Sequence, residues 1–284
     1  MTNQKTLGGI HTIEELVWAQ ENDPGLVDEC LAQVSILPDL EKYLKWLHDN
    51  QVTTKVVSNL RRRKKRGLGI HPSSVCKRPV CLKKIYLECT GETEPLREYD
   101  QRSQMTFDIG TLLHDTMQGW LKEMFENQLE VEKSLVNEDL HIVGHADGLF
   151  SFPQTRFVLE LKSIKEGGNY GWEKVQLKPM EDNVRQAHIY MYVENVPFAN
   201  VFYMGKNNSD FKEHPLVFNP QIWAELEQDI VQVVKAAYED HQPAVASPGY
   251  HCKYCDFLHA CAEGRGQNAK GTRTSRVGRS GRIR

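Results

Sequence analysis

Two carboxylates and one amine in the middle of the chain are spaced in a way that suits metal-assisted chemistry on a phosphate ester. Asp147 comes first, and Glu160 and Lys162 follow in a run from Arg156 that is typical of a buried strand. Side chains alternate along a strand, so Glu160 and Lys162 share one face. Two carboxylates can hold one or two Mg²⁺ ions, which prefer oxygen ligands, against a scissile phosphate. The amine can orient water or offset transition-state charge, so the pattern predicts phosphodiester hydrolysis.

These residues need a scaffold, and the surrounding sequence predicts strands alternating with helices. Short helices are expected within 13–50, and longer helices near 106–127, 179–194 and 220–240. The first and last of the longer helices carry apolar residues at helical spacing. Strands are expected near 130–136, 140–151, 156–164, 199–206 and 211–218. The fold class is therefore α/β.

Two pairs of residues on the predicted helices each share one helix face. Gly110 and His114 lie one turn apart on one helix face, and Gln186 and Tyr190 do so on the helix after the lysine strand. A lone histidine on an amphipathic helix is usually structural. The plain alternative for the second pair places Tyr190 in the core and Gln186 at a cap or the surface.

Three closely spaced cysteines near the end of the chain indicate a metal site. Cys252, Cys255 and Cys261 form a C-x-x-C-x-x-x-x-x-C pattern in a chain with no sign of secretion. A fourth ligand must come from elsewhere, and the upstream candidates are Cys76 and Cys81. Four thiolates suit both a structural zinc ion and an iron–sulfur cluster. Cys30 and Cys89 have the character of ordinary buried thiols.

Taken in order, these motifs resemble the PD-(D/E)XK nuclease superfamily, in the branch of RecB-like exonucleases that carry a four-cysteine iron–sulfur cluster. Members of that branch include CRISPR-associated and AddB-type proteins, and the resemblance covers about residues 70–262. It implies a restriction-endonuclease-like mixed central sheet flanked by helices, with a C-terminal cysteine-bound metal cluster. It also implies a catalytic group made of Asp147, Glu160, Lys162, Gln186 and Tyr190.

The resemblance further implies two kinds of metal. Mg²⁺ or Mn²⁺ would be held by Asp147, Glu160, the carbonyl of Leu161 and His114, and neutral imidazole suits Mn²⁺ somewhat better than Mg²⁺. A [4Fe–4S] cluster would be held by Cys81, Cys252, Cys255 and Cys261. Cys81 is preferred because it follows a serine pair and precedes a basic pair and an aromatic, as the first cysteine of the family does. Cys76 and a zinc site remain open alternatives.

The implied function is exonuclease action on DNA, mostly at single-stranded or free ends, in recombination, repair or replication. The expected setting is the cytoplasm of a bacterium or of a phage-infected host, with a recombination or replication protein as a further partner. Three alternatives stay open. One is a catalytically inactive nuclease-fold protein that binds DNA or acts as a scaffold. The others are a structure-specific endonuclease and a nuclease that trims DNA during CRISPR adaptation.

Charge distribution favours nucleic acid in spite of a net charge of −3 over 284 residues. Residues 61–66 are six consecutive positive charges, and residues 264–284 hold seven positive charges and no acid. Such blocks bind phosphates by releasing counterions, although solvated linkers also carry them. The expected division is a helical N-terminal extension with a basic connector at 1–69, the nuclease domain at 70–262 and a disordered basic tail at 263–284. No long apolar run predicts a membrane span.

Overall fold

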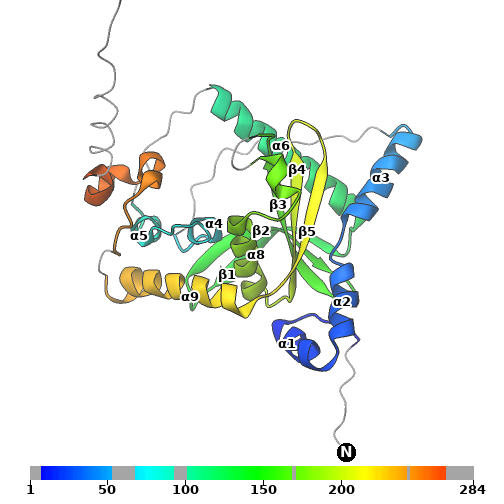
Figure 1. The fold of residues 1–284 in the computed structure, drawn as a ribbon, viewed down its shortest axis with the longest axis horizontal. Helices are drawn as coiled ribbons and strands as arrows, with labels where there is room; N and C mark the ends of the chain where they lie inside the picture. Colours follow the sequence, from blue (N-terminus) through cyan, green and yellow to red (C-terminus); the bar gives the residue numbers. More distant parts are fainter. Residues whose placement is uncertain (1–7, 53–67, 93–100, 168–170, 242–243, 267–284) are drawn as a thin grey trace, which may run out of the picture.

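A five-stranded sheet forms the centre of the protein in the computed structural model, which describes residues 8–52, 68–92, 101–167, 171–241 and 244–266. Its strands lie side by side in chain order (Figure 1): β1 Leu129–Asn137, β2 Ile142–Ser151, β3 Arg156–Ile164, β4 Phe198–Gly205 and β5 Phe211–Val217. Only β3 and β4 are parallel, and every other neighbouring pair is antiparallel. The sheet is therefore mixed, as expected.

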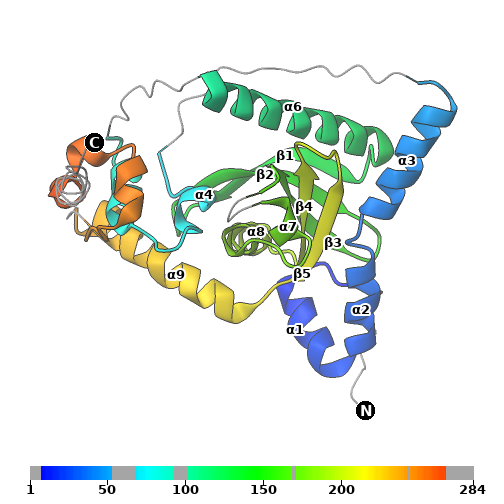
Figure 2. The ribbon, with the colours of Figure 1, turned by 45° about the horizontal axis from the view of Figure 1, so that its top comes forward.

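Helices cover both faces of this sheet (Figure 2). The long helix α6 (Gln101–Met124) lies on one face, while α8 (Glu181–Val193) and α9 (Pro220–Val234) lie on the other. A strand buried on both faces reads as a nearly continuous apolar run. This explains the all-buried β4 and the buried stretch 157–161 of β3, in which Glu160 is the one charged residue among apolar ones.

Shorter elements complete the two covers. Helices α4 (Pro72–Val75) and α5 (Leu82–Cys89) precede α6, and α7 (Trp172–Val175) lies in the crossover between β3 and β4. A π-helical turn, Lys235–Glu239, extends α9, and 3-10 turns follow at Tyr250–Tyr254 and Leu258–Ala260. Figures 1 and 2 both show these C-terminal turns beside α5.

The three N-terminal helices pack into the same core. These helices are α1 (Ile13–Asn22), α2 (Pro24–Ala32) and α3 (Leu37–Asp49). Glu213 of β5 accepts hydrogen bonds from the backbone N–H groups of Ile36 and Leu37, at 2.9 and 3.2 Å, and so caps the start of α3. Asn200 of β4 donates to the carbonyl of Val34 at 2.8 Å. The sheet edge thus anchors this segment through polar contacts as well as apolar ones.

The predicted strands and long helices are confirmed, with ends shifted by a few residues. Helix α6 begins at Gln101 rather than near 106, and α9 ends at Val234 rather than near 240, with the π-helical turn continuing to Glu239. The basic block at 61–66 and the tail from residue 267 lie outside the described residues, and the division into three domains stays a prediction. No helix in the described ranges is both long enough and apolar enough to cross a membrane.

Candidate active site

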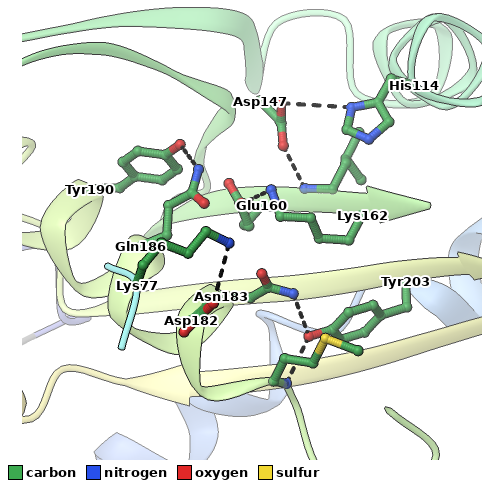
Figure 3. A network of polar contacts seen from close by, with 12 residues as sticks. Lys77, His114, Asp147, Glu160, Lys162, Asp182, Asn183, Gln186, Tyr190 and Tyr203 are labelled. Carbon is green, nitrogen blue, oxygen red and sulfur yellow. Dashed lines mark hydrogen bonds and ion pairs between the residues drawn. The ribbon is translucent and has the colours of Figure 1, made fainter. Parts of the chain in front are cut away.

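The site lies where β2 and β3 separate. The two strands pair from Ser151 opposite Arg156 to Gly148 opposite Leu159, and the ladder ends there. At the next position the carboxylate of Asp147 accepts the backbone N–H of Leu161 at 2.6 Å (Figure 3). A side chain therefore satisfies a strand donor just beyond the end of the ladder, and it fixes Asp147 against the strand that carries the other two charged residues.

Glu160 and Lys162 meet on the face of β3 that α8 covers. Glu160 is fully buried, and the ammonium group of Lys162 forms an ion pair with its Oε1 (Figure 3). Among the described residues, neither oxygen of Glu160 has a well-formed hydrogen bond. The side chain of Lys162 is 32% exposed, so the amine connects the buried carboxylate with the surface.

Glu160 and Lys162 shift each other's pKa. Burial raises the pKa of Glu160 to about 7, although the charge of Lys162 opposes the shift. Burial by itself would lower the pKa of Lys162, but the charges of Glu160 and Asp147 outweigh it and raise that pKa. Lys162 therefore keeps its proton at neutral pH, while a bound cation would favour the ionised form of Glu160.

Helix α6 brings His114 to the same point. Its Nδ1 lies 3.8 Å from Oδ1 of Asp147. Burial lowers the pKa of His114, which favours the neutral imidazole that binds metals. Gly110, one turn earlier, explains how the helix comes so close. A Cβ there would lie 3.2 Å from Oγ of Ser163 and 3.3 Å from Nζ of Lys206.

Helix α8 supplies the other predicted pair. The side-chain amide of Gln186 donates to the hydroxyl of Tyr190, and both residues are buried (Figure 3). Burial and the neighbouring charges of Glu160 and Asp147 raise the pKa of Tyr190. Its hydroxyl lies close enough to Glu160 to lower the pKa of that carboxyl. Gln186 is thus not a surface residue, and the pair lies directly over Glu160.

Two residues at the site were not singled out from the sequence. Gln118 of α6 donates to the carbonyl of Asp147 at 3.0 Å and to Oε1 of Glu132 at 2.9 Å. Glu132 has a φ of 52°, the left-handed region that non-glycine residues seldom adopt, at the position in β1 opposite Asp147. Gln118 follows His114 by one helical turn, and that spacing is the signal that could have found it.

The donor set suits a divalent cation. Within the described ranges, no three His, Cys, Asp or Glu side chains already surround a common metal position. Even so, Asp147 and neutral His114 are neighbours, and buried Glu160 presents two oxygens without well-formed hydrogen bonds. Oxygen and imidazole donors of this kind fit Mg²⁺ or Mn²⁺. The carbonyl of Leu161 as an additional ligand stays a prediction.

The cysteines separate into two places. Cys81 is the N-cap residue of α5, and its thiol lies close enough to Cys255 and Cys261 to affect the pKa of both, which burial already raises. Cys76, only five residues earlier, points elsewhere. Burial raises the pKa of Cys76 to about 11, and the charges that act on it include Glu160 and Lys162.

Backbone amides surround the C-terminal sulfurs. The N–H of Gly249 donates to Sγ of Cys252 and the N–H of Gly264 donates to Sγ of Cys261, each at 3.4 Å. A Cβ on Gly264 would lie 3.4 Å from the sulfur of Cys261 and 3.6 Å from that of Cys252, so both sulfurs border one point. Two of the three C-terminal sulfurs thus accept backbone hydrogen bonds, although no three cysteines of the described ranges surround a common metal position.

Solved structures match this chain at low identity, whereas no protein-family profile and no curated protein sequence matches it. A protein designated SSO0001 is 16% identical, with 81% of this chain and 98% of that one covered and a TM-score of 0.45. An alkaline exonuclease from Laribacter hongkongensis is 11% identical, with coverages of 60% and 87% and a TM-score of 0.44. A phage-related exonuclease from Haemophilus somnus is 12% identical, with coverages of 69% and 96% and a TM-score of 0.39. Likenesses this weak decide neither the family nor the activity of the chain.

Proposed function

We propose that this protein is a metal-dependent deoxyribonuclease that hydrolyses phosphodiester bonds. One observation carries the proposal: the buried carboxylate of Glu160 faces the ammonium of Lys162 beside Asp147, at a fork in the sheet. A buried charge without full hydrogen bonding is costly, so such an arrangement is seldom kept for stability alone. Perturbed, mutually coupled acids and bases of this kind are typical of functional sites.

Each residue then has a defined task. Asp147, Glu160 and His114 would hold Mg²⁺ or Mn²⁺, which supplies Lewis-acid chemistry to the phosphate and to water. Lys162 keeps its proton and places a positive charge where β2 and β3 separate. There it would offset the negative charge that accumulates on the phosphate in the transition state. Gln186 is bonded to Tyr190, whose hydroxyl lies near Glu160 on the α8 side. The pair would position the DNA strand.

The finer assignment draws its support from the sequence resemblance. RecB-like motifs favour exonuclease action on single-stranded or free DNA ends, within recombination, repair or replication. They also favour a [4Fe–4S] cluster on Cys81, Cys252, Cys255 and Cys261. The effect of Cys81 on the pKa values of Cys255 and Cys261 and the amide–sulfur hydrogen bonds support that ligand set. Such a cluster would join α5 to the C-terminal turns and would be mainly structural.

Digestion of end-labelled linear, circular and flap DNA with Mg²⁺ or Mn²⁺ tests the proposal. Wild-type protein should degrade linear DNA from its ends, and Lys162→Ala should bind DNA without cutting it. Cleavage of circles or flaps instead would identify an endonuclease. Binding without cleavage by any form of the protein would leave a DNA-binding or scaffold protein and would refute the nuclease assignment.

A further inference from the structure

One side-chain amide of α6 joins two elements that carry proposed metal ligands. Nε2 of Gln118 donates to the backbone carbonyl of Asp147 at 3.0 Å and to Oε1 of Glu132 at 2.9 Å. A primary amide has two N–H donors, so both are used. Gln118 follows His114 by one helical turn and lies on the same face of α6. The helix that carries one proposed ligand thus holds the backbone of another.

The ladder between β1 and β2 is interrupted where this amide reaches it. The two strands pair in the same register on both sides of Glu132 and Asp147, but these two residues do not pair with each other. Glu132 has a φ of 52°, in the left-handed region that is strained for a residue with a side chain. Strain of this kind persists where the surroundings fix it, and it is concentrated at functional sites. At this break the amide of Gln118 bridges the two strands.

Asp147 is also held from the side of β3. Its carboxylate accepts the backbone N–H of Leu161 at 2.6 Å, and its Oδ1 lies 3.8 Å from Nδ1 of His114. Gln118 fixes the backbone of Asp147 and Leu161 fixes its side chain, so the carboxylate has little freedom to move relative to the imidazole. Donors that are already in place bind a cation more tightly, because less ordering is needed when it binds.

We propose that Gln118 is a positioning residue, which sets the carboxylate of Asp147 relative to the imidazole of His114 for binding of Mg²⁺ or Mn²⁺. Glu132 orients the amide of Gln118 through its hydrogen bond. The inference rests on the proposed nuclease function and deepens it, because it identifies the contacts that tune the affinity for the metal. Groups that orient metal ligands in this way contribute about 10- to 100-fold to metal affinity or activity.

Binding of Mn²⁺ to DNA-free protein, followed by electron paramagnetic resonance, tests the inference without relying on cleavage. Gln118→Ala should raise the Kd of Mn²⁺ by about tenfold, the lower end of that range. Its cleavage rate should approach the wild-type rate as Mn²⁺ is added, because the metal ligands themselves are intact.

Variants of Glu132 separate its hydrogen bond from its charge. Burial lowers the pKa of His114, and the charges of Asp147 and Glu132 oppose that shift, so an effect of charge on the site is the alternative. Glu132→Gln keeps an oxygen that accepts the amide of Gln118 and should bind Mn²⁺ as wild type does. Glu132→Ala has no acceptor and should bind Mn²⁺ more weakly. Equal losses in both variants would overturn the role of the hydrogen bond and identify an effect of charge.

The matched control is Gln104→Ala, which removes another glutamine of α6, one whose amide donates to Asp108 of the same helix at 2.8 Å. It should leave the Kd of Mn²⁺ unchanged. An unchanged Kd in Gln118→Ala, even with lower stability in urea, would overturn the positioning role and leave a structural contact. Wild type that binds Mn²⁺ but cuts no DNA would refute the nuclease function alone, because the Kd values would still decide the role of Gln118. Wild type that binds no Mn²⁺ would overturn the metal site and this inference together.

Discussion

The carboxylate of Asp147 accepts the backbone N–H of Leu161 at 2.6 Å, and Leu161 is the residue between Glu160 and Lys162. One hydrogen bond thus ties the strand that carries the first acid to the strand that carries the other two charged groups. Asp147 also lies beside His114 of α6. In the proposed function Asp147 therefore has a structural task and a chemical one, and substitutions can separate the two.

Asp147→Asn and Asp147→Ala should differ in stability but not in activity. The neutral amide of an asparagine cannot bind a cation as a carboxylate does, so both variants should lose cleavage by at least about 10²-fold. Asparagine still accepts the N–H of Leu161, whereas alanine leaves this buried donor unpaired at a cost of about 1–3 kcal/mol. Urea unfolding of metal-free protein measures the difference. Equal stability of the two variants would mean that the hydrogen bond contributes nothing.

Gly110→Ala should harm activity more than stability. Alanine favours a helix over glycine by about 1 kcal/mol. Its Cβ would press on Ser163 and Lys206, so α6 must shift and carry His114 with it. A displacement near 1 Å can cost about 10²-fold in rate. Gly119→Ala on the same helix is the matched control, because nothing lies within 4 Å of its Cβ. It should stabilise the protein and leave cleavage unchanged.

Local patterns predicted most of the scaffold. The apolar run of β3 and the helical spacing in α6 gave the right element types because burial sets both periodicities. The contact between Glu160 and Lys162 follows from strand alternation alone. Their meeting with Asp147 depends on the register of β2 against β3 and on where that ladder ends, and no local pattern encodes a register.

The choice between two cysteine ligands also depends on long-range contacts that no local pattern encodes. Cys76 and Cys81 are five residues apart, and the cysteine spacing alone admits either as the fourth ligand, yet one lies near Glu160 and the other near Cys255. Long-range contacts orient the intervening segment, among them the ion pair between Arg78 and Asp229 of α9 at 3.0 Å. Gln118 and Glu132 were not predicted as site residues, because they reach Asp147 only through contacts between α6, β1 and β2.

His188 should make the fold sensitive to acid. Its Nδ1 lies 2.7 Å from the carbonyl of Val184, and its Nε2 accepts the N–H of Asn219 at 3.1 Å, so the buried ring is neutral. Burial lowers the pKa of His188 below its ordinary value of 6.5. Below pH 6.5 the unfolded chain therefore binds a proton that the folded protein does not. The free energy of unfolding then decreases as the pH is lowered, by up to about 1.4 kcal/mol per pH unit.

The measurement is the free energy of unfolding from neutral pH down through the acid range, for wild type and His188→Gln. The variant should be less stable at neutral pH because the contacts to Val184 and Asn219 are disturbed. Its curve below pH 6.5 should be shallower, because one proton-linked group is gone. Parallel curves would show that another residue controls the acid sensitivity.

Cysteine substitutions should separate the proposed cluster ligands from the other thiols. Cys81→Ser should lose iron and sulfide and destabilise the fold, because Cys81 lies beside Cys255 and Cys261. Cys30→Ser and Cys76→Ser should keep both, because Cys30 contacts the carbonyl of Gln154 and Cys76 lies near Glu160 and Lys162. Iron, sulfide and zinc analysis of anaerobically purified protein measures the outcome. Iron retained in Cys81→Ser but lost in Cys76→Ser would show that Cys76, and not Cys81, is the fourth cluster ligand. Stoichiometric zinc without iron in wild type would replace the cluster by a four-thiolate zinc site.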